Sequence, residues 1–440
     1  MHRVRARPKL TTEPGDTIFA LSSGAPPCGV GVIRISGPRA VEALERLTGA
    51  LPAPRRASLR QVVDPVAGWL DEALVLWLPG PHSATGEDCA EIHCHGGRAV
   101  IMAIEHALAS SCGLRHAGAG EFTRRAFLNG RMDLLQAEAL GDMLSAETEL
   151  QRAVLASAAG GTASASVSRW REGILAASAA VEQELDFSDD DQEEAGKHAS
   201  AWRDGVASIA SEMQAWLSVP SADRLREGLR VVLAGPPNSG KSSLFNAILD
   251  EAAAIVSPIA GTTRDAIERP VAIGGVPFLL VDTAGLRSEG AEEIERIGIA
   301  RAEAELARAD IVLWLGPEGE GPEGAHEVAS MIDLPDAGRK SGASLHVSAE
   351  TREGLPQLLE ALAAMGRDRL PRPGQVAVSR RQRALLDEAH AALRSAVALD
   401  DLLLAGESLR RARHAMDAML GNVATEDMLD TLFGRFCIGK

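Results

Sequence analysis

Residues 229–249 read LRVVLAGPPNSGKSSLFNAIL, and this stretch determines the fold class of the central part of the chain. An apolar run of strand type leads into Gly235-x-x-x-x-Gly240-Lys241-Ser242, and an amphipathic helical pattern follows. Glycines at this spacing let backbone N–H groups close around phosphate oxygens, while the helix dipole and the lysine add positive charge. The stretch therefore predicts a phosphate-binding loop between a buried strand and a helix.

Two motifs further along indicate a nucleotide switch. LLVDTAGL, residues 279–286, brings Asp282 to the end of a second apolar strand, where a carboxylate can hold Mg²⁺. AGTTRD, residues 260–265, places Thr263 where it can close on the metal when a third phosphate is bound. The order of the motifs predicts a GTPase, and a protein that only binds ATP is the alternative. The predicted phosphate contacts are Asn238, Ser239, Gly240, Lys241, Ser242, Ser243, Asp282, Thr283, Ala284 and Gly285, with Ser242 and Thr263 holding Mg²⁺.

Base recognition is where the pattern departs from other GTPases. They usually present Asn-Lys-x-Asp after the next strand, whereas this chain has SMID at residues 330–333, so that only Asp333 can pair with guanine N–H groups. Ser348 and Ala349 offer backbone that can meet guanine O6, and guanine is favoured over a relaxed nucleotide preference. Leu286 stands where a water-positioning glutamine is usual, so hydrolysis requires another arrangement.

Composition narrows the class of protein. A chain of 440 residues with 45% hydrophobic content exceeds a single ordinary core, so two or three globular domains are expected. The five cysteines form no CxxC pair, and their odd number suits a reducing compartment, from which we expect a cytoplasmic protein. The sequence contains neither an apolar run long enough to span a membrane nor a basic start followed by the apolar region of a secretion signal. We therefore expect no membrane association.

The net charge of −16 is unevenly distributed. Residues 1–131 carry 15 Lys and Arg against 12 Asp and Glu, whereas the remainder carries 30 against 49. A nucleic acid is therefore expected to meet the N-terminal third or a local patch. Arg124 and Arg125 are candidates for such contacts, although half-exposed arginines on a helix are usually only solvated.

The hydrophobic pattern changes three times along the chain. Short apolar runs alternate with helical stretches up to about residue 130, and the pattern is then helical to about residue 220 and again from about residue 380. The segment between alternates strand, loop and helix, as a parallel sheet requires. We predict a multidomain α/β plus α fold in which a P-loop GTPase domain is inserted into a discontinuous helical domain. The predicted ranges are 1–131 for the N-terminal α/β domain, 132–222 and 374–440 for the helical halves, and 223–373 for the P-loop domain.

Four further motifs extend the pattern over nearly the whole chain. They are GVGVIRISG (29–37), PGPHSATGEDCAEIHCHGG (79–97), GEFTRRAFLNGRMDLLQAEAL (120–140) and FCIGK (436–440). Together with the phosphate loop and the switch motifs, this set resembles the MnmE (TrmE) family of tRNA modification GTPases.

The resemblance implies an activity and its partners. Members act with an FAD-containing partner, MnmG, to install an aminomethyl-type group on C5 of the wobble uridine, U34, of certain tRNAs. The carbon comes from 5-formyltetrahydrofolate or a related tetrahydrofolate, and GTP hydrolysis is stimulated by K⁺. The N-terminal domain binds folate and forms a homodimer. A regulatory GTPase with a folate-binding scaffold and no chemistry of its own is the alternative.

Matched motif by motif, the resemblance also implies site residues. The implied folate contacts are Arg34, Glu91, Arg131 and Lys440. The implied K⁺ ligands are Asn238, Ser257, Ile259 and Thr262. Glu295 corresponds to the acid that orients the attacking water, but the preceding loop is one residue longer than usual, which leaves Glu292 and Glu293 as rivals.

The segment FCIGK has three interpretations. A prenylation box needs aliphatic residues after the cysteine, and Gly439 with Lys440 fits that pattern poorly. A docked tail would use Phe436 and Ile438 as apolar anchors and Gly439 as a bend that aims Lys440 at folate. Cys437 is then either a thiol that attacks the wobble uridine or a small packed hydrophobe.

The cluster EIHCHGG raises the question of a zinc site. Its candidate ligands are Cys89, His93, Cys94 and His95. Neighbouring residues of a strand point to opposite faces, so we do not expect these side chains to share one ion.

Overall fold

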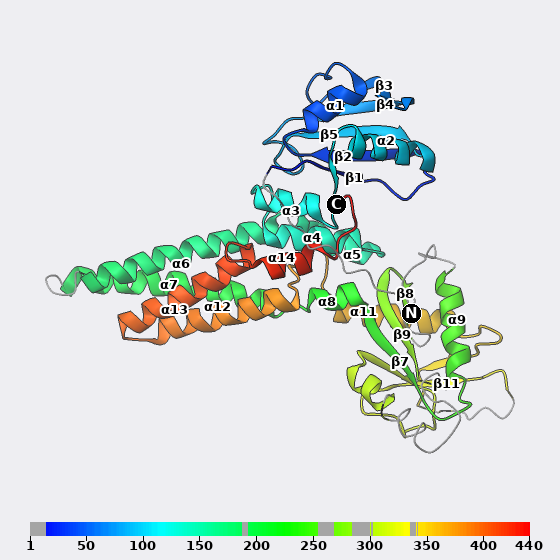
Figure 1. Ribbon diagram of the computed structural model, residues 1–440. Coiled ribbons are helices and arrows are strands. Elements are labelled where there is room, and N and C mark those ends of the chain that lie inside the picture. Colours follow the sequence, from blue (N-terminus) through cyan, green and yellow to red (C-terminus); the bar gives the residue numbers. More distant parts are fainter. Residues whose placement is uncertain are drawn as a thin grey trace. The chain divides into compact units, whose positions relative to one another are not determined.

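The computed structural model describes residues 15–186, 192–253, 268–283, 300, 302–334, 340 and 342–440. It divides into two compact units (Figure 1). The first unit combines the chain up to Gly141 with Asp417–Lys440, and the second comprises Asp142–Met416.

A six-stranded sheet forms the centre of the first unit. Its order is β3-β4-β5-β2-β1-β6, and all neighbours are antiparallel except β1 and β6. The strands are β1 (Ile18–Leu21), β2 (Val30–Ser36), β3 (Ser58–Asp64), β4 (Gly68–Leu78), β5 (Cys89–His95) and β6 (Arg115–His116). The helices are α1 (Ala40–Thr48), α2 (Arg98–Ser110), α3 (Glu121–Leu128), α4 (Leu134–Leu144) and α14 (Glu426–Phe433).

The two faces of this sheet have different partners. Ile33 and Ile35 of β2 and Ile92 of β5 are buried against the apolar stripes of α1 and α2. Because side chains alternate along a strand, Arg34 and Glu91 lie on the opposite face. We refer to the side that carries Arg34 and Glu91 as the polar face of the sheet.

Helices α3 and α14 are joined by a buried charge. Arg124 is only 1% exposed and forms ion pairs with Glu426 and with Asp430, the latter at 2.7 Å. Arg125 is also buried and is paired with acidic side chains. The prediction that these arginines are half exposed and available to a nucleic acid is therefore wrong, because their own acidic partners enclose them.

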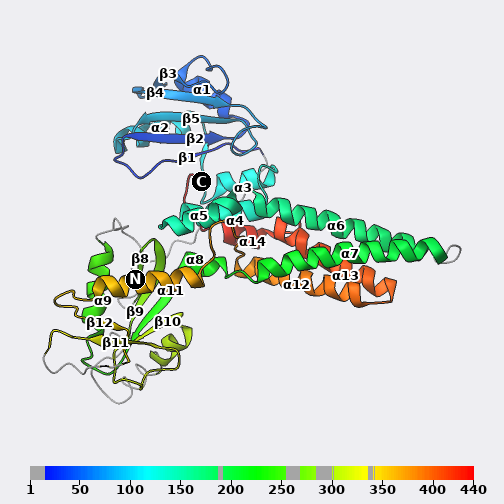
Figure 2. The ribbon, with the colours of Figure 1, turned by 180° about the vertical axis from the view of Figure 1, so that it is seen from behind.

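A group of helices forms one part of the second unit (Figure 2). They are α5 (Glu149–Ala159), α6 (Thr162–Asp186), α7 (Gln192–Leu217), α8 (Ala222–Glu227), α12 (Arg380–Ala398) and α13 (Leu402–Leu420). Of these, α6, α7, α12 and α13 are long. Trp170 of α6 and Trp216 of α7 stack with ring centroids 4.5 Å apart. Arg383 of α12 donates to the Leu217 carbonyl at the end of α7, so segments from both sides of the P-loop domain pack together.

A second six-stranded sheet, in the order β12-β11-β10-β7-β9-β8, forms the other part of this unit. It is parallel except for β8, which is antiparallel to β9. The strands are β7 (Leu229–Ala234), β8 (Glu268–Ile273), β9 (Val276–Asp282), β10 (Ile311–Trp314), β11 (His326–Ser330) and β12 (Leu345–Val347). The helices whose bounds are described are α9 (Lys241–Ala253) and α11 (Leu355–Arg369).

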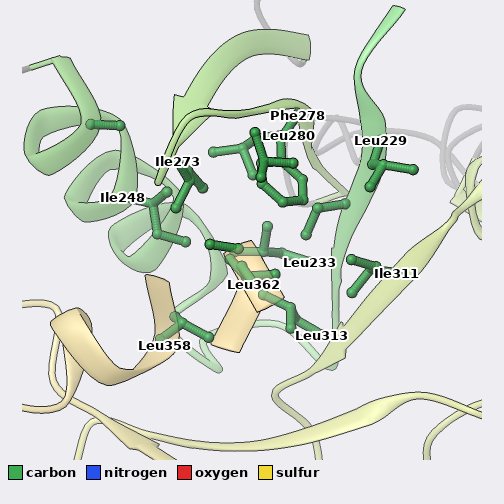
Figure 3. Close-up of a cluster of buried hydrophobic side chains, with 14 of the residues drawn as sticks. Leu229, Leu233, Ile248, Ile273, Phe278, Leu280, Ile311, Leu313, Leu358 and Leu362 are labelled. Atoms are coloured by element: carbon green, nitrogen blue, oxygen red, sulfur yellow. The ribbon is translucent and has the colours of Figure 1, made fainter. Parts of the chain in front are cut away.

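The core of this sheet is aliphatic (Figure 3). Leu233 of β7 and Leu313 of β10 pack with Ile248 of α9 and Leu362 of α11, and all four side chains are fully buried. These contacts fix the strand ends from which the phosphate-binding loop emerges.

The predicted fold class, α/β domains plus helices, is confirmed. The four domain ranges remain a proposal. Within the described residues, no helix combines the length and the apolar content that crossing a bilayer requires.

Candidate functional site

The phosphate-binding loop joins β7 to α9, as the sequence predicts. Gly235 has φ +151°, and a Cβ atom there would lie 2.9 Å from the Ser239 hydroxyl and 3.0 Å from the Gly316 nitrogen, so this position requires glycine. Asn238 adopts φ +61°, a conformation that asparagine tolerates better than most residues. These positive φ values let the loop turn back on itself, as a loop that cradles phosphate with its backbone N–H groups requires.

Charged side chains line the loop. Lys241 is buried and donates from Nζ to the Pro236 carbonyl at 2.6 Å, which holds the cation over the loop. The Ser242 hydroxyl donates to Asp282 Oδ2 at 2.7 Å. A hydroxyl and a carboxylate in contact are the oxygen donors that Mg²⁺ prefers, so Ser242 and Asp282 fit that ion. When bound there, Mg²⁺ would neutralise charge on the phosphates.

The loops after β11 and β12 lie at the same edge of the sheet as the phosphate-binding loop, because all three strands are parallel. The Ser330 hydroxyl donates to the Ser239 carbonyl at 2.8 Å, which ties the end of β11 to that loop. Asp333 is exposed. Ser348 is fully buried and its Oγ accepts from the Thr351 amide.

Several predicted contacts lie outside the described residues. They are Ser257, Ile259, Thr262, Thr263, Ala284, Gly285 and Glu295, together with the rivals Glu292 and Glu293.

The polar face of the N-terminal sheet brings two predicted residues together. Arg34 and Glu91 are register partners on β2 and β5, and they form an ion pair of 3.0 Å. His93 Nε2 lies 3.0 Å from the other carboxylate oxygen of Glu91. The Arg34 guanidinium also sits 5.8 Å from the centroid of the Phe122 ring. Burial by itself would raise the pKa of Glu91, but the hydrogen bond from His93 and the charge of Arg34 outweigh it and lower that pKa.

Arg131 and Lys440 are placed differently. Arg131 is exposed beside the turn that contains Gly86, where a Cβ atom would lie 3.2 Å from its side chain. Within the described part of the chain, neither residue bonds to the Arg34–Glu91 pair. The structure thus brings two of the four predicted folate contacts into direct contact.

The segment FCIGK docks within the first unit. Phe436 is buried beside Gly141, whereas Ile438 is 64% exposed and forms a backbone bridge with Ala119. The prediction that Ile438 is an apolar anchor is therefore wrong, because its backbone rather than its side chain makes the contact. The Gly439 carbonyl accepts from the Ser22 hydroxyl at 2.8 Å.

Gly439 makes the bend that the docked tail requires. It has φ +94°, and a Cβ atom there would lie 2.1 Å from the Leu21 carbonyl oxygen. Leu21 follows Ala20, the register partner of Arg34. The tail therefore passes close to the Arg34–Glu91 pair, and the exposed Cys437 lies in this segment.

Buried acids hold α3 against the sheet. Glu121 is fully buried and accepts from Arg115 Nη2 at 2.6 Å and from the Gly118 amide at 2.8 Å. Burial by itself would raise the pKa of Glu121, but these hydrogen bonds outweigh it and lower that pKa. Burial would also raise the pKa of Asp16, but the nearby Arg115 and Arg125 outweigh that effect and lower it.

These lowered pKa values predict acid sensitivity. A carboxyl group whose folded pKa is depressed contributes stability above its unfolded pKa and loses it as the pH falls through the folded pKa. We expect the denaturant midpoint of the full chain to fall steeply below about pH 5. Glu121→Gln should be less stable at pH 7 and should show a flatter acid decline than the unsubstituted protein. Parallel declines in the two proteins would contradict this role.

Comparisons with known proteins identify the family to which the chain belongs. Residues 17–131 match the family model described as GTP-binding protein TrmE N-terminus, and residues 134–437 match the MnmE helical domain. The chain belongs to the MnmE family. Proteins named tRNA modification GTPase MnmE are 59% identical in Erythrobacter litoralis and 57% in Novosphingobium aromaticivorans, each over 97% of this chain and the whole relative. One from Rhizobium meliloti is 43% identical over 97% of this chain and 99% of its own length. The resemblance stated from the motifs is confirmed.

Within the family's N-terminal domain, two histidines of EIHCHGG have separate partners. His93 contacts Glu91, whereas His95 Nδ1 lies 2.8 Å from Asp71 Oδ1. Cys94 is buried on the other face of β5, where desolvation raises the pKa of its thiol to about 11. His93 was not predicted as a site residue, although the period of two along β5 places it on the face of Glu91.

Proposed function

We propose that this chain is a K⁺-stimulated GTP hydrolase that modifies C5 of U34 in certain tRNAs, together with an FAD-containing partner of the MnmG kind. The carbon would come from 5-formyltetrahydrofolate or a related tetrahydrofolate. Relatives that span almost the whole chain carry the name tRNA modification GTPase. The observation that carries the proposal is the phosphate-binding loop in which Lys241 and the Ser242–Asp282 pair converge.

The GTPase part of the proposal assigns roles to this chain's own residues. Lys241 binds the terminal phosphates, and Ser242 and Asp282 hold Mg²⁺, with Thr263 joining when the third phosphate is present. Asp333 pairs with guanine, and Ser348 and Ala349 supply backbone beside it. Ser243, Thr283, Ala284 and Gly285 complete the nucleotide contacts. Glu295 orients the attacking water, with Glu292 and Glu293 as the residues to exclude.

The folate part of the proposal rests on the polar face of the N-terminal sheet. A carboxylate such as Glu91 accepts from the paired N–H groups of a pterin, and Arg34, already in contact with it, fixes its orientation. Arg131 and Lys440 would contribute cations toward the folate carboxylates. The buried Phe122 ring lies 5.8 Å from the Arg34 guanidinium and helps to hold it in place.

We also propose that the chain forms a homodimer through the edge of this sheet. Leu59 opposes Leu74, and Val63 opposes Trp69, on the paired strands β3 and β4. All four side chains are exposed, with Trp69 at 64%. An exposed apolar patch on an edge strand and its neighbour is unfavourable in water, and a second copy of the chain would cover it. Light scattering on the purified protein measures the mass and tests this.

A regulatory GTPase without chemistry of its own is the alternative. The deciding experiment measures modification of U34 in tRNA by mass spectrometry, with the flavin partner, folate and GTP each omitted in turn. Modification should require all three. Glu91→Gln should lose modification while it keeps GTP turnover, and Glu295→Ala should lose turnover while Glu292→Ala and Glu293→Ala keep it. Unchanged modification by Glu91→Gln would favour the alternative.

A further inference from the structure

Ser330, the last residue of β11, and Met331, which follows it, both lie against the phosphate-binding loop. Ser330 ends β11, and its hydroxyl reaches across to the Ser239 carbonyl in the phosphate-binding loop at 2.8 Å. Ser239 is itself buried and lies two residues before Lys241. Since a side chain on one strand end holds the backbone of the other loop, the Ser330 hydroxyl fixes where the phosphate-binding loop sits relative to β11.

Met331 is turned toward the same loop. It adopts φ +56°, in the left-handed region where methionine is uncommon, and such a conformation at a binding loop is often part of its function. Its Cγ and Sδ atoms lie 3.4 Å and 3.7 Å from the position that a Cβ atom would take on Gly240. The thioether therefore rests against the last glycine of the loop, at the edge of the sheet where β11 and β12 end.

The chemistry and the position of the Met331 side chain indicate its role. A nucleotide whose phosphates lie in the loop must place its base toward the ends of β11 and β12, because ligands of parallel sheets bind at the carboxyl ends of the strands. A methionine side chain is apolar, polarizable and unbranched, which suits contact with the flat face of a ring. It carries no charge and no donor, so it cannot distinguish one purine from another.

We propose that Met331 is the platform for one face of the purine ring and that Ser330 is the positioning residue that holds the phosphate-binding loop against this platform. Different residues then determine how tightly a nucleotide binds and which base is selected. Met331 contributes affinity for any purine, Ser330 contributes affinity for the triphosphate, and selection of guanine is left to Asp333 and the backbone of Ser348 and Ala349. This inference rests on the proposed function, because it takes a purine nucleotide as the ligand of the loop.

The test compares ligands that contain or lack a base. Dissociation constants of GTP, ATP and inorganic tripolyphosphate are measured with Mg²⁺ by titration calorimetry on the full chain. Met331→Ala should weaken GTP and ATP alike, by about 10-fold or more, and should leave tripolyphosphate unchanged. Met331→Leu should keep most of the affinity, because it restores apolar contact area. Leu334→Ala is the matched control, since Leu334 is an exposed neighbour of similar size and should have no effect.

Ser330 has a different expected signature. Ser330→Ala should weaken all three ligands, tripolyphosphate included, whereas Ser330→Thr should retain binding because it keeps the hydroxyl. Asp333→Asn should lower only the preference for GTP over ATP.

The outcomes separate this inference from the function it rests on. If Met331→Ala binds GTP normally, or loses tripolyphosphate as strongly as GTP, Met331 is no platform for the base. If Ser330→Ala retains tripolyphosphate affinity, the positioning role is wrong. If the unsubstituted protein binds ATP as tightly as GTP while Met331→Ala weakens both, the platform is supported and the guanine preference of the proposed function is overturned.

Discussion

GTP hydrolysis by this protein is expected to be faster in K⁺ than in Na⁺ by a factor on the order of 10³, the lower end of what an arginine finger contributes. The proposed K⁺ ligands are Asn238, Ser257, Ile259 and Thr262, which together would hold a cation against the charge that develops on the transferred phosphate. Leu286 cannot position water as glutamine does, so hydrolysis requires another arrangement. Steady-state turnover at equal ionic strength in the two salts checks the expectation.

The backbone conformation of Asn238 determines which substitution tests this prediction. Because φ is +61° there, alanine would strain the loop as well as remove the amide, whereas glycine removes the amide without strain. Asn238→Gly should therefore bind GTP almost normally and lose the difference between K⁺ and Na⁺. Equal turnover of the unsubstituted protein in both salts would remove potassium from the proposal.

Local sequence was sufficient for the nucleotide-binding part of the fold. Strand, loop and helix are contiguous between residues 229 and 249, and the apolar run of β7 is buried almost without interruption, as expected for a central strand of a parallel sheet. The tie between Ser330 and Ser239 was not predicted, because it joins positions 91 residues apart and depends on the order of strands in the sheet. The absence of the usual asparagine from residues 330–333 gives no indication that a serine hydroxyl makes this contact.

Contacts between residues far apart in the sequence also determine the N-terminal site. Arg34 and Glu91 are 57 residues apart, and only the family resemblance connected them before the sheet register did. Arg124 was judged from its charge, which favours exposure, whereas two acids of α14 more than 300 residues away make its burial tolerable. Burial of a charged group is decided by partners that a linear pattern does not reveal.

Removal of residues 437–440 is expected to abolish U34 modification and to weaken folate binding by at least about 10-fold, since a charge-assisted contact of Lys440 contributes roughly 1.5 to 3 kcal/mol. Gly439→Ala should reproduce the loss of folate affinity, because its Cβ atom cannot fit 2.1 Å from the Leu21 carbonyl. Ile438→Ala should change little, since that side chain is 64% exposed. Folate affinity is measured by fluorescence titration of the full chain.

Cys437→Ser then separates docking from chemistry. The thiol is exposed in a segment whose backbone is fixed on both sides, by the bridge at Ile438 and by burial of Phe436, so it is held in place yet accessible to a substrate. Serine preserves size and backbone but is a far weaker nucleophile at neutral pH. We expect Cys437→Ser to bind folate, GTP and the flavin partner normally and to modify no tRNA. Normal modification by this variant would show that the thiol has no part in the chemistry, and weakened folate binding would assign it to docking.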